Sequence, residues 1–80
     1  MAIVTSKEVY RKCLTEPWAV GGFIGYDLEI MQAAIEAGID EQAPIMVQAS
    51  CRVIDYAGAD RLYAMAQAFS SAYGVPVILH

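Results

Sequence analysis

The chain has 80 residues, of which 58% are hydrophobic and 18% are charged, and its formal net charge is −4. This acidic balance argues against a nucleic-acid partner, which would need a basic patch, and against electrostatic attachment to a membrane. The longest apolar runs fall far short of the roughly 20 residues that span a bilayer. The charged fraction is below the usual ~25%. We therefore expect the chain to be part of a larger protein or to bury apolar surface against a partner.

The two cysteines, Cys13 and Cys51, fit neither a CxxC motif nor a zinc-ribbon spacing. We expect both to be free thiols on buried or half-buried small side chains, in a reducing compartment. Charged residues from Lys7 to Lys12 interrupt the N-terminal stretch, so no signal peptide is expected. The predicted location is the cytoplasm.

The first half of the chain predicts two helices and one strand. Thr5 and Glu8 have the spacing of a capping box, which predicts a helix over residues 6–14. The apolar run from Trp18 to Ile24 is typical of a strand buried on both faces, as in a parallel sheet. Asp27 is placed to cap a second helix, and Gly38 is placed to end it.

The second half predicts two more strands and a third helix. Residues 44–50 form the second strand candidate, and residues 51–58 are expected to be a loop with a helical turn around 53–56. Asp60 is placed to cap the third helix, which Gly74 should end before a third strand over 75–80. The apolar stripe of that helix consists of Leu62, Met65, Ala66, Phe69, Ala72 and Tyr73.

This order, helix–strand three times over, predicts an α/β fold with three parallel strands and right-handed helical crossovers. Residues 1–80 show no linker or repeat, so we interpret them as one partial domain without an internal boundary. An open sheet of three strands leaves two unpaired edges. We therefore expect self-association or a complementing chain.

Chemistry in α/β folds is concentrated at the carboxyl ends of the strands. Here these ends carry Gly25, Ser50 and His80. His80 is the single histidine, and one imidazole cannot form a zinc site, which takes three or four protein ligands. The glycines between Gly21 and Gly25 lack the GxGxxG spacing of a dinucleotide-binding loop. The residues alone therefore indicate where a site would lie, and they assign no catalytic residue, metal ligand or cofactor to this chain.

Five segments, in colinear order over nearly the whole chain, are similar to segments of the class II ketose-bisphosphate aldolases. They are Trp18–Phe23, Leu28–Ala33, Ala43–Ser50, Tyr56–Gly58 and Tyr73–His80. The fructose-bisphosphate and tagatose-bisphosphate members resemble the chain about equally. The resemblance implies the N-terminal αβαβαβ part of a (β/α)8 barrel.

The resemblance also implies a reaction. A complete family member is expected to hold zinc, to polarise the ketose carbonyl with it, and to cleave a ketose 1,6-bisphosphate reversibly to dihydroxyacetone phosphate and a phosphorylated aldehyde. Ser50 matches a serine near the substrate phosphate, and His80 matches the first histidine of an H-x-D-H motif beside the active site. Ile24 stands where the family usually has asparagine. The catalytic aspartate and the zinc ligands of the family would follow His80, so these 80 residues alone are expected to be inactive.

Two alternatives remain open. The chain could be one of two polypeptides that together complete a barrel enzyme, and a sugar bisphosphate would then bind only in the completed barrel. It could instead be a non-enzymatic, self-associating α/β module.

Overall fold

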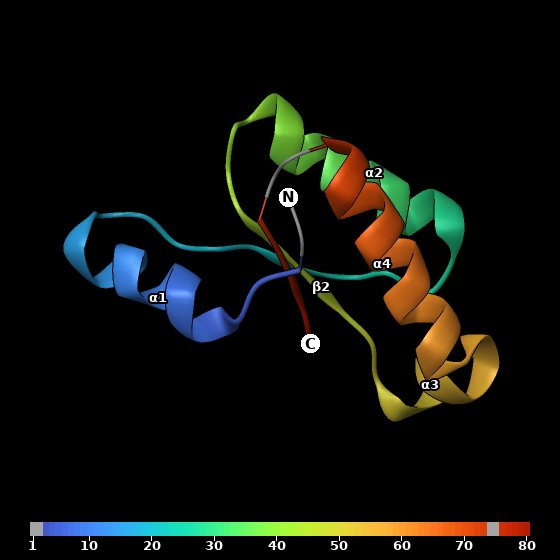
Figure 1. The fold of residues 1–80 in the computed structure, drawn as a ribbon. Coiled ribbons are helices and arrows are strands. Elements are labelled where there is room, and N and C mark those ends of the chain that lie inside the picture. The colour runs from blue at the N-terminus through green and yellow to red at the C-terminus, as the bar shows by residue number, and fades with distance from the viewer. Residues whose placement is uncertain (1–2, 74–75) are drawn as a thin grey trace.

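The computed structural model describes residues 3–73 and 76–80. It confirms the α/β fold with three parallel strands and helical crossovers (Figure 1). In chain order the elements are α1 (Ser6–Thr15), β1 (Gly22–Ile24), α2 (Leu28–Asp40), β2 (Ile45–Gln48), α3 (Cys51–Ala57), α4 (Ala59–Tyr73) and β3 (Val77–Leu79).

The sheet has the strand order β1-β2-β3, and both neighbouring pairs are parallel. Phe23 of β1 is paired with Val47, and Val47 is paired with Leu79 of β3. Each strand lies next to the strand that precedes it in the chain, with helices in the crossovers. This is the arrangement of consecutive strands in a (β/α)8 barrel, where the same pattern continues to eight strands.

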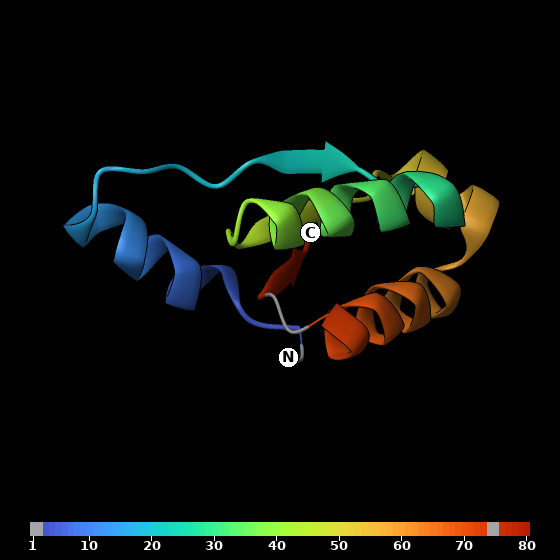
Figure 2. The same ribbon diagram turned by 90° about the horizontal axis from the view of Figure 1, so that it is seen from above.

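The main core lies between the sheet and the two crossover helices α2 and α4, which cover the same face (Figures 1 and 2). We call this the outer face. Side chains alternate along a strand, so Ile45, Val47 and Val77 all point to it. Complete burial of one such side chain contributes about 1.5–3 kcal/mol. The buried members of this core are Met31, Ile35, Ile45, Val47, Leu62, Ala66 and Val77.

The opposite face, which we call the inner face, carries Met46 and Ile78. Helix α1 packs against it through Val9, its one buried residue. Trp18 and Val20, in the extended segment between α1 and β1, join this smaller cluster. The first helix therefore covers part of the sheet face that the crossover helices leave open.

Helix α1 begins where the sequence predicts, but not by the predicted capping box. Thr5 has the extended backbone of an N-cap, yet its side chain makes no capping hydrogen bond. Glu8 contributes a negative charge to the first turn, where the helix dipole favours it. The prediction of a side-chain cap was wrong, and the helix is held by the packing of Val9 instead.

The prediction of a first strand buried on both faces was also wrong. Strand β1 covers only three residues, and all three are exposed. Phe23 and Ile24 are 51% and 56% exposed. The reason is topological, because β1 is an edge strand, and Figure 2 shows it at the margin of the fold.

Helix α2 confirms the predicted cap and corrects the predicted end. The carboxylate of Asp27 accepts a hydrogen bond from the amide of Ile30 at 2.8 Å. Gly38 is not the residue after the helix; it lies within α2 and is buried. A Cβ atom on Gly38 would lie 3.1 Å from the carbonyl oxygen of Ala43, so glycine lets the helix approach the start of β2. The positive φ that follows the helix, 52°, belongs to Gln42.

The segment predicted as a loop with a helical turn is a full helix, α3, with Ser50 as its N-cap. Gly58, with a φ of 90°, separates α3 from α4. Helix α4 begins at Ala59, so Asp60 lies in its first turn and does not precede it as predicted. The Oδ1 atom of Asp60 accepts a hydrogen bond from the amide of Arg61 at 3.0 Å.

The predicted stripe of α4 is confirmed in part. Leu62 and Ala66 are buried, Met65 and Phe69 are half-buried, and Ala72 is exposed. Ser70, which the pattern did not single out, is completely buried and donates to the carbonyl of Gln67 at 3.1 Å. The side chain of Tyr73 and the predicted helix end at Gly74 lie outside the described residues.

The chain also pairs its two ends. Ile3 forms an isolated parallel bridge with Val77, and the amide of Val4 donates to the carbonyl of Val77 at 2.9 Å. The segment before α1 thus lies beside the start of β3, on the edge that β2 does not occupy.

Candidate functional site at the carboxyl ends of the strands

The carboxyl ends of the three strands are held together by backbone hydrogen bonds. The amide of Gly25 donates to Gln48 at 3.0 Å, and the amide of His80 donates to Val47 at 2.9 Å. The amide of Ala49 donates in turn to the carbonyl of His80 at 2.8 Å. The structure therefore brings together the strand ends that the sequence singled out.

A shallow hollow lies at this edge of the sheet. Its lining consists of Ile24, Gln48, Ala49, Ser50 and His80. Gln48, Ser50 and His80 supply an amide, a hydroxyl and an imidazole, whereas Ile24 adds an apolar wall beside Gln48. The hollow can therefore offer hydrogen bonds to a polar ligand from two neighbouring strands.

Gln48 is the lining residue that the sequence reasoning missed as a candidate. It shares the inner face with Met46, and its amide nitrogen lies 3.5 Å from the sulfur of Met46. A Cβ atom on Gly22 would approach the Gln48 amide nitrogen to 2.8 Å, so the glycine makes room for this side chain. Gln48 is two residues from Met46, so both side chains lie on the same face of β2. The apolar pattern of the strand did not show which of its two faces borders a hollow.

Ser50 lines the hollow and also caps helix α3. Its Oγ accepts a hydrogen bond from the amide of Val53 at 3.3 Å. The side chain is exposed, so the hydroxyl proton can still be donated outward. The local structural role and a ligand-binding role are therefore compatible.

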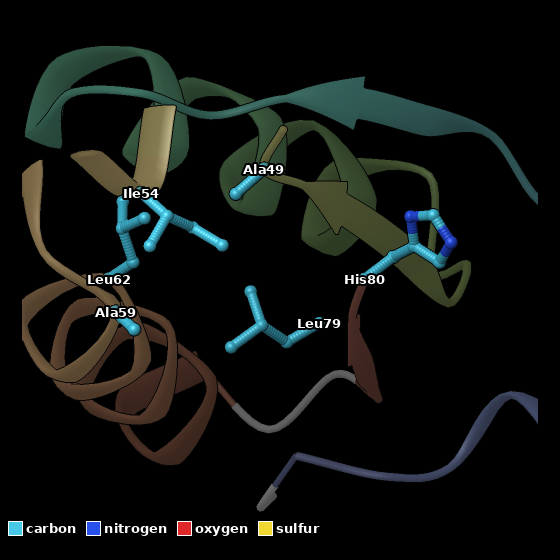
Figure 3. Close-up of a pocket in the computed structure, with 6 residues that line it drawn as sticks. All are labelled: Ala49, Ile54, Ala59, Leu62, Leu79 and His80. Carbon is cyan, nitrogen blue, oxygen red and sulfur yellow. The ribbon is translucent and has the colours of Figure 1, made fainter. Parts of the chain in front are cut away.

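His80 stands at the boundary between two surfaces. On the outer-face side, an apolar pocket is lined by Ala49, Ile54, Ala59, Leu62, Leu79 and His80. Figure 3 shows the Leu79 side chain directed toward this pocket and the His80 ring turned away from its apolar side chains. The imidazole is exposed. Alternation along β3 thus separates an apolar residue from a polar one at the strand end.

The metal expected from the family resemblance does not fit the residues described here. No group of three or more histidine, cysteine, aspartate or glutamate side chains is arranged to hold a metal ion within residues 3–73 and 76–80. A zinc ion takes four ligands in most structural sites and three plus water in catalytic ones. We therefore derive no chemical step through a metal from this chain.

Neither cysteine adds to the site. Both are free; Cys13 is half-buried as expected, whereas Cys51 is exposed in the first turn of α3, contrary to expectation.

Within the described ranges, no helix is long and apolar enough to cross a membrane.

Comparison with known proteins identifies the family. The model of the class-II fructose-bisphosphate aldolase family matches residues 4–80. Because this match covers nearly the whole chain, the chain belongs to the class II aldolase family.

The curated relatives are several kinds of aldolase. The chain is 41% identical over 58 residues, 72% of its length, to 6-phospho-5-dehydro-2-deoxy-D-gluconate aldolase of Halalkalibacterium halodurans. It is 34% identical over 79 residues, 98% of its length, to a fructose-bisphosphate aldolase of Helicobacter pylori. It is 29% identical over its full length to sulfofructosephosphate aldolase of Alkalicoccus urumqiensis. The chain spans only 20%, 26% and 28% of these three relatives, about a quarter of their length.

Proposed function

We propose that this chain supplies the first quarter of a class II aldolase, and that the completed barrel reversibly cleaves a ketose 1,6-bisphosphate. The products are dihydroxyacetone phosphate and a phosphorylated aldehyde. Zinc would be held by residues outside this chain, because the described residues lack a ligand set. These 80 residues alone are proposed to be inactive.

One observation carries the proposal. Polar side chains from two adjacent parallel strands converge on a hollow at the carboxyl edge of the sheet, namely Gln48, Ser50 and His80. In barrels of this type, the active site lies at that edge. The edge of the sheet and the family membership therefore point to the same place.

The names of the relatives support a phosphorylated substrate. All three curated names contain a phosphorylated compound, although the compounds differ. In our proposal the Ser50 hydroxyl donates to a phosphate oxygen of the substrate, and the Gln48 amide orients a neighbouring polar group. His80 lies beside the reacting centre without binding the metal by itself.

A chimera tests this function. The chain would replace the matching 26% of the Helicobacter pylori fructose-bisphosphate aldolase. We expect zinc-dependent cleavage of fructose or tagatose 1,6-bisphosphate by the chimera and none by the 80-residue chain. Loss of one hydrogen bond to a charged phosphate by Ser50→Ala should lower kcat/KM about 10- to 100-fold. Ser71→Ala, the same change at an exposed position on α4, is the control.

Two results would decide against the proposal. One is a folded, zinc-loaded chimera without cleavage of any phosphorylated ketose. The other is equal kcat/KM for Ser50→Ala and Ser71→Ala, which would remove Ser50 from the substrate site.

The strand order β1-β2-β3, which is part of a barrel sheet, favours a second possibility, in which a separate polypeptide completes the barrel. Native mass spectrometry of the protein purified from its source distinguishes the cases. A complex that contains a second chain and zinc supports a split aldolase, whereas a species built only from the 8.7 kDa chain excludes it.

Because both thiols are free, we propose that the protein works in the reducing cytoplasm.

A further inference from the structure

The hollow at the carboxyl ends of the strands has one apolar side, which belongs to β1. Ile24 is paired with Gln48 of β2, and both residues line the hollow. Side chains alternate along a strand, so Ile24 lies on the inner face together with Gly22, which has no side chain. Ile24 is therefore the one inward side chain that β1 contributes.

The polar end of Gln48 is turned away from Ile24. Its amide nitrogen lies 3.5 Å from the sulfur of Met46, and a Cβ atom on Gly22 would lie 2.8 Å from the same nitrogen. Gly22 and Met46 are paired with each other, two residues before Ile24 and Gln48. The amide thus reaches back toward the amino ends of the strands, and the β1 side of the hollow presents the hydrocarbon of Ile24.

The other side of the hollow is polar. Ser50 follows β2 and His80 follows β3, and both line the hollow with exposed side chains. A hydroxyl group that is placed against a hydrocarbon wall loses its hydrogen bonds to water and gains none in return. A ligand that fits this hollow therefore has polar groups toward Ser50 and His80 and a carbon without a hydroxyl toward Ile24.

The chemistry of aldol cleavage shows which substrate hydroxyl is not needed. Cleavage of a ketose 1,6-bisphosphate breaks the bond between C3 and C4. The hydroxyl on C4 loses its proton and becomes the aldehyde, the electron pair of the broken bond passes to C3 beside the C2 carbonyl, and C3 then takes up a proton. The hydroxyl on C5 takes part in none of these changes, and C5 lies between the reacting carbons and the phosphate on C6.

We propose that Ile24 determines specificity in the completed barrel and selects a ketose 1,6-bisphosphate that has a CH2 group at C5. This inference rests on the proposed function, in which His80 lies beside the reacting centre and Ser50 donates to a phosphate. A substrate that spans these two residues crosses the ends of β3 and β2, so that C5 faces the adjacent wall of β1. The aldehyde released is 3-phosphooxypropanal, which has no hydroxyl next to its carbonyl carbon.

A comparison of two substrates in the Helicobacter pylori chimera tests the inference. Fructose 1,6-bisphosphate and its 5-deoxy analogue differ only in the C5 hydroxyl. We expect kcat/KM of the zinc-loaded chimera to be about tenfold higher for the 5-deoxy analogue, which is within the range over which a hydrophobic pocket discriminates. Equal values, or a preference for fructose 1,6-bisphosphate, would overturn the inference without any variant.

Two substitutions of Ile24 separate its polarity from its size. Ile24→Val and Ile24→Thr introduce side chains of nearly the same shape, but only threonine offers a hydroxyl. The preference for the 5-deoxy analogue should persist in Ile24→Val and fall about tenfold in Ile24→Thr, because the threonine hydroxyl can pair with the C5 hydroxyl. Equal preferences in the two variants, with equal zinc content and circular dichroism, would contradict the role of Ile24.

The outcomes distinguish this inference from the proposed function. Cleavage of fructose 1,6-bisphosphate that does not depend on the residue at position 24 leaves the aldolase proposal standing and removes only the role of Ile24. A folded, zinc-loaded chimera that cleaves neither substrate removes both.

Discussion

At the scale of single residues, two helix starts show that position alone does not make a cap. Thr5 and Asp27 both have extended backbones immediately before a helix. Only Asp27 places an oxygen on a free amide, that of Ile30. A side-chain cap satisfies one of the amide groups that a helix start leaves unpaired. The two residues therefore form a natural pair for comparison.

We predict that Asp27→Ala lowers the free energy of unfolding by about 1 kcal/mol, the usual effect of losing a side-chain cap. Thr5→Ala should change it by a few tenths of a kcal/mol at most, because no capping bond is lost. Urea unfolding measures both. Equal losses in the two variants would contradict the assignment of the cap.

Gly25 lies where the core leaves no room for a side chain. It is buried, and a Cβ atom there would lie 2.8 Å from Cγ1 of Val47 in the core. We predict that Gly25→Ala lowers the free energy of unfolding by about 1–3 kcal/mol, as overpacking of a core usually does. The measurement is again urea unfolding.

Gly21→Ala is the matched control for this overpacking. A Cβ atom on Gly21 would meet the ring of Phe23 at 2.7 Å, but that ring is exposed and can rotate away. We expect a smaller loss of stability than for Gly25→Ala. The reverse order would show that the ring of Phe23 is held more rigidly than the core.

At the scale of elements, periodicity predicted the crossover helices well because their apolar faces contact the sheet directly. The stripe through Leu62 and Ala66 is an example. The pattern failed for β1, because an apolar run looks the same whether a neighbouring strand covers it or not. It also failed for α3, a helix of seven residues that contacts the core only through the half-buried Val53 and Ala57. Ser50, its cap, was recognised only as a strand end.

The residues of the candidate site also divide into those that the sequence predicted and one that it missed. Ser50 and His80 were predicted because they end strands, and the edge to which they belong depends only on the parallel order. Gln48 was missed because residues 44–49 contain only one polar residue, and a continuous apolar run does not reveal which face is open. Helix α1 packs on one part of the inner face, through the cluster that contains Met46. At the carboxyl end of β2 the same face borders the hollow, and Gln48 lines it there.

The docking of α1 gives a prediction at this scale. We predict that Val9→Ala lowers the free energy of unfolding by about 2 kcal/mol, because it removes buried methyl groups from the contact with Met46 and Ile78. Leu14→Ala, on the same helix but 88% exposed, should have almost no effect. Fluorescence of Trp18, the one tryptophan, reports the change since it belongs to the same cluster. Equal effects of the two variants would mean that α1 does not dock through Val9.

At the scale of the whole molecule, the chain has the strand order of a barrel but only part of its circumference. Within residues 3–73 and 76–80, β2 lies between β1 and β3, and helix α1 packs on the inner face. The proposed enzyme needs the remaining strands of the barrel.

The small number of possible zinc ligands gives a prediction for the whole chain. We predict no stoichiometric zinc binding to the 80-residue protein at micromolar concentrations, because His80 is its only imidazole. Calorimetric titration with zinc, together with metal analysis of the same sample, measures this. His80→Ala is the control for weak binding to a single side chain. Tight one-to-one binding to the chain would show that cysteine and carboxylate groups can assemble a site after all.

The pairing of Val4 with Val77 has a consequence for synthesis, since it joins positions 73 residues apart (77 − 4). The ribosome makes α1 first, but Val9 of this helix packs against Ile78 of β3, which is made 69 residues later (78 − 9). At about 5–20 residues per second, several seconds separate the two events. During that time the apolar side of α1 has no sheet to cover. The nascent chain should therefore present this short helix to chaperones, and release of β3 from the exit tunnel should end that exposure.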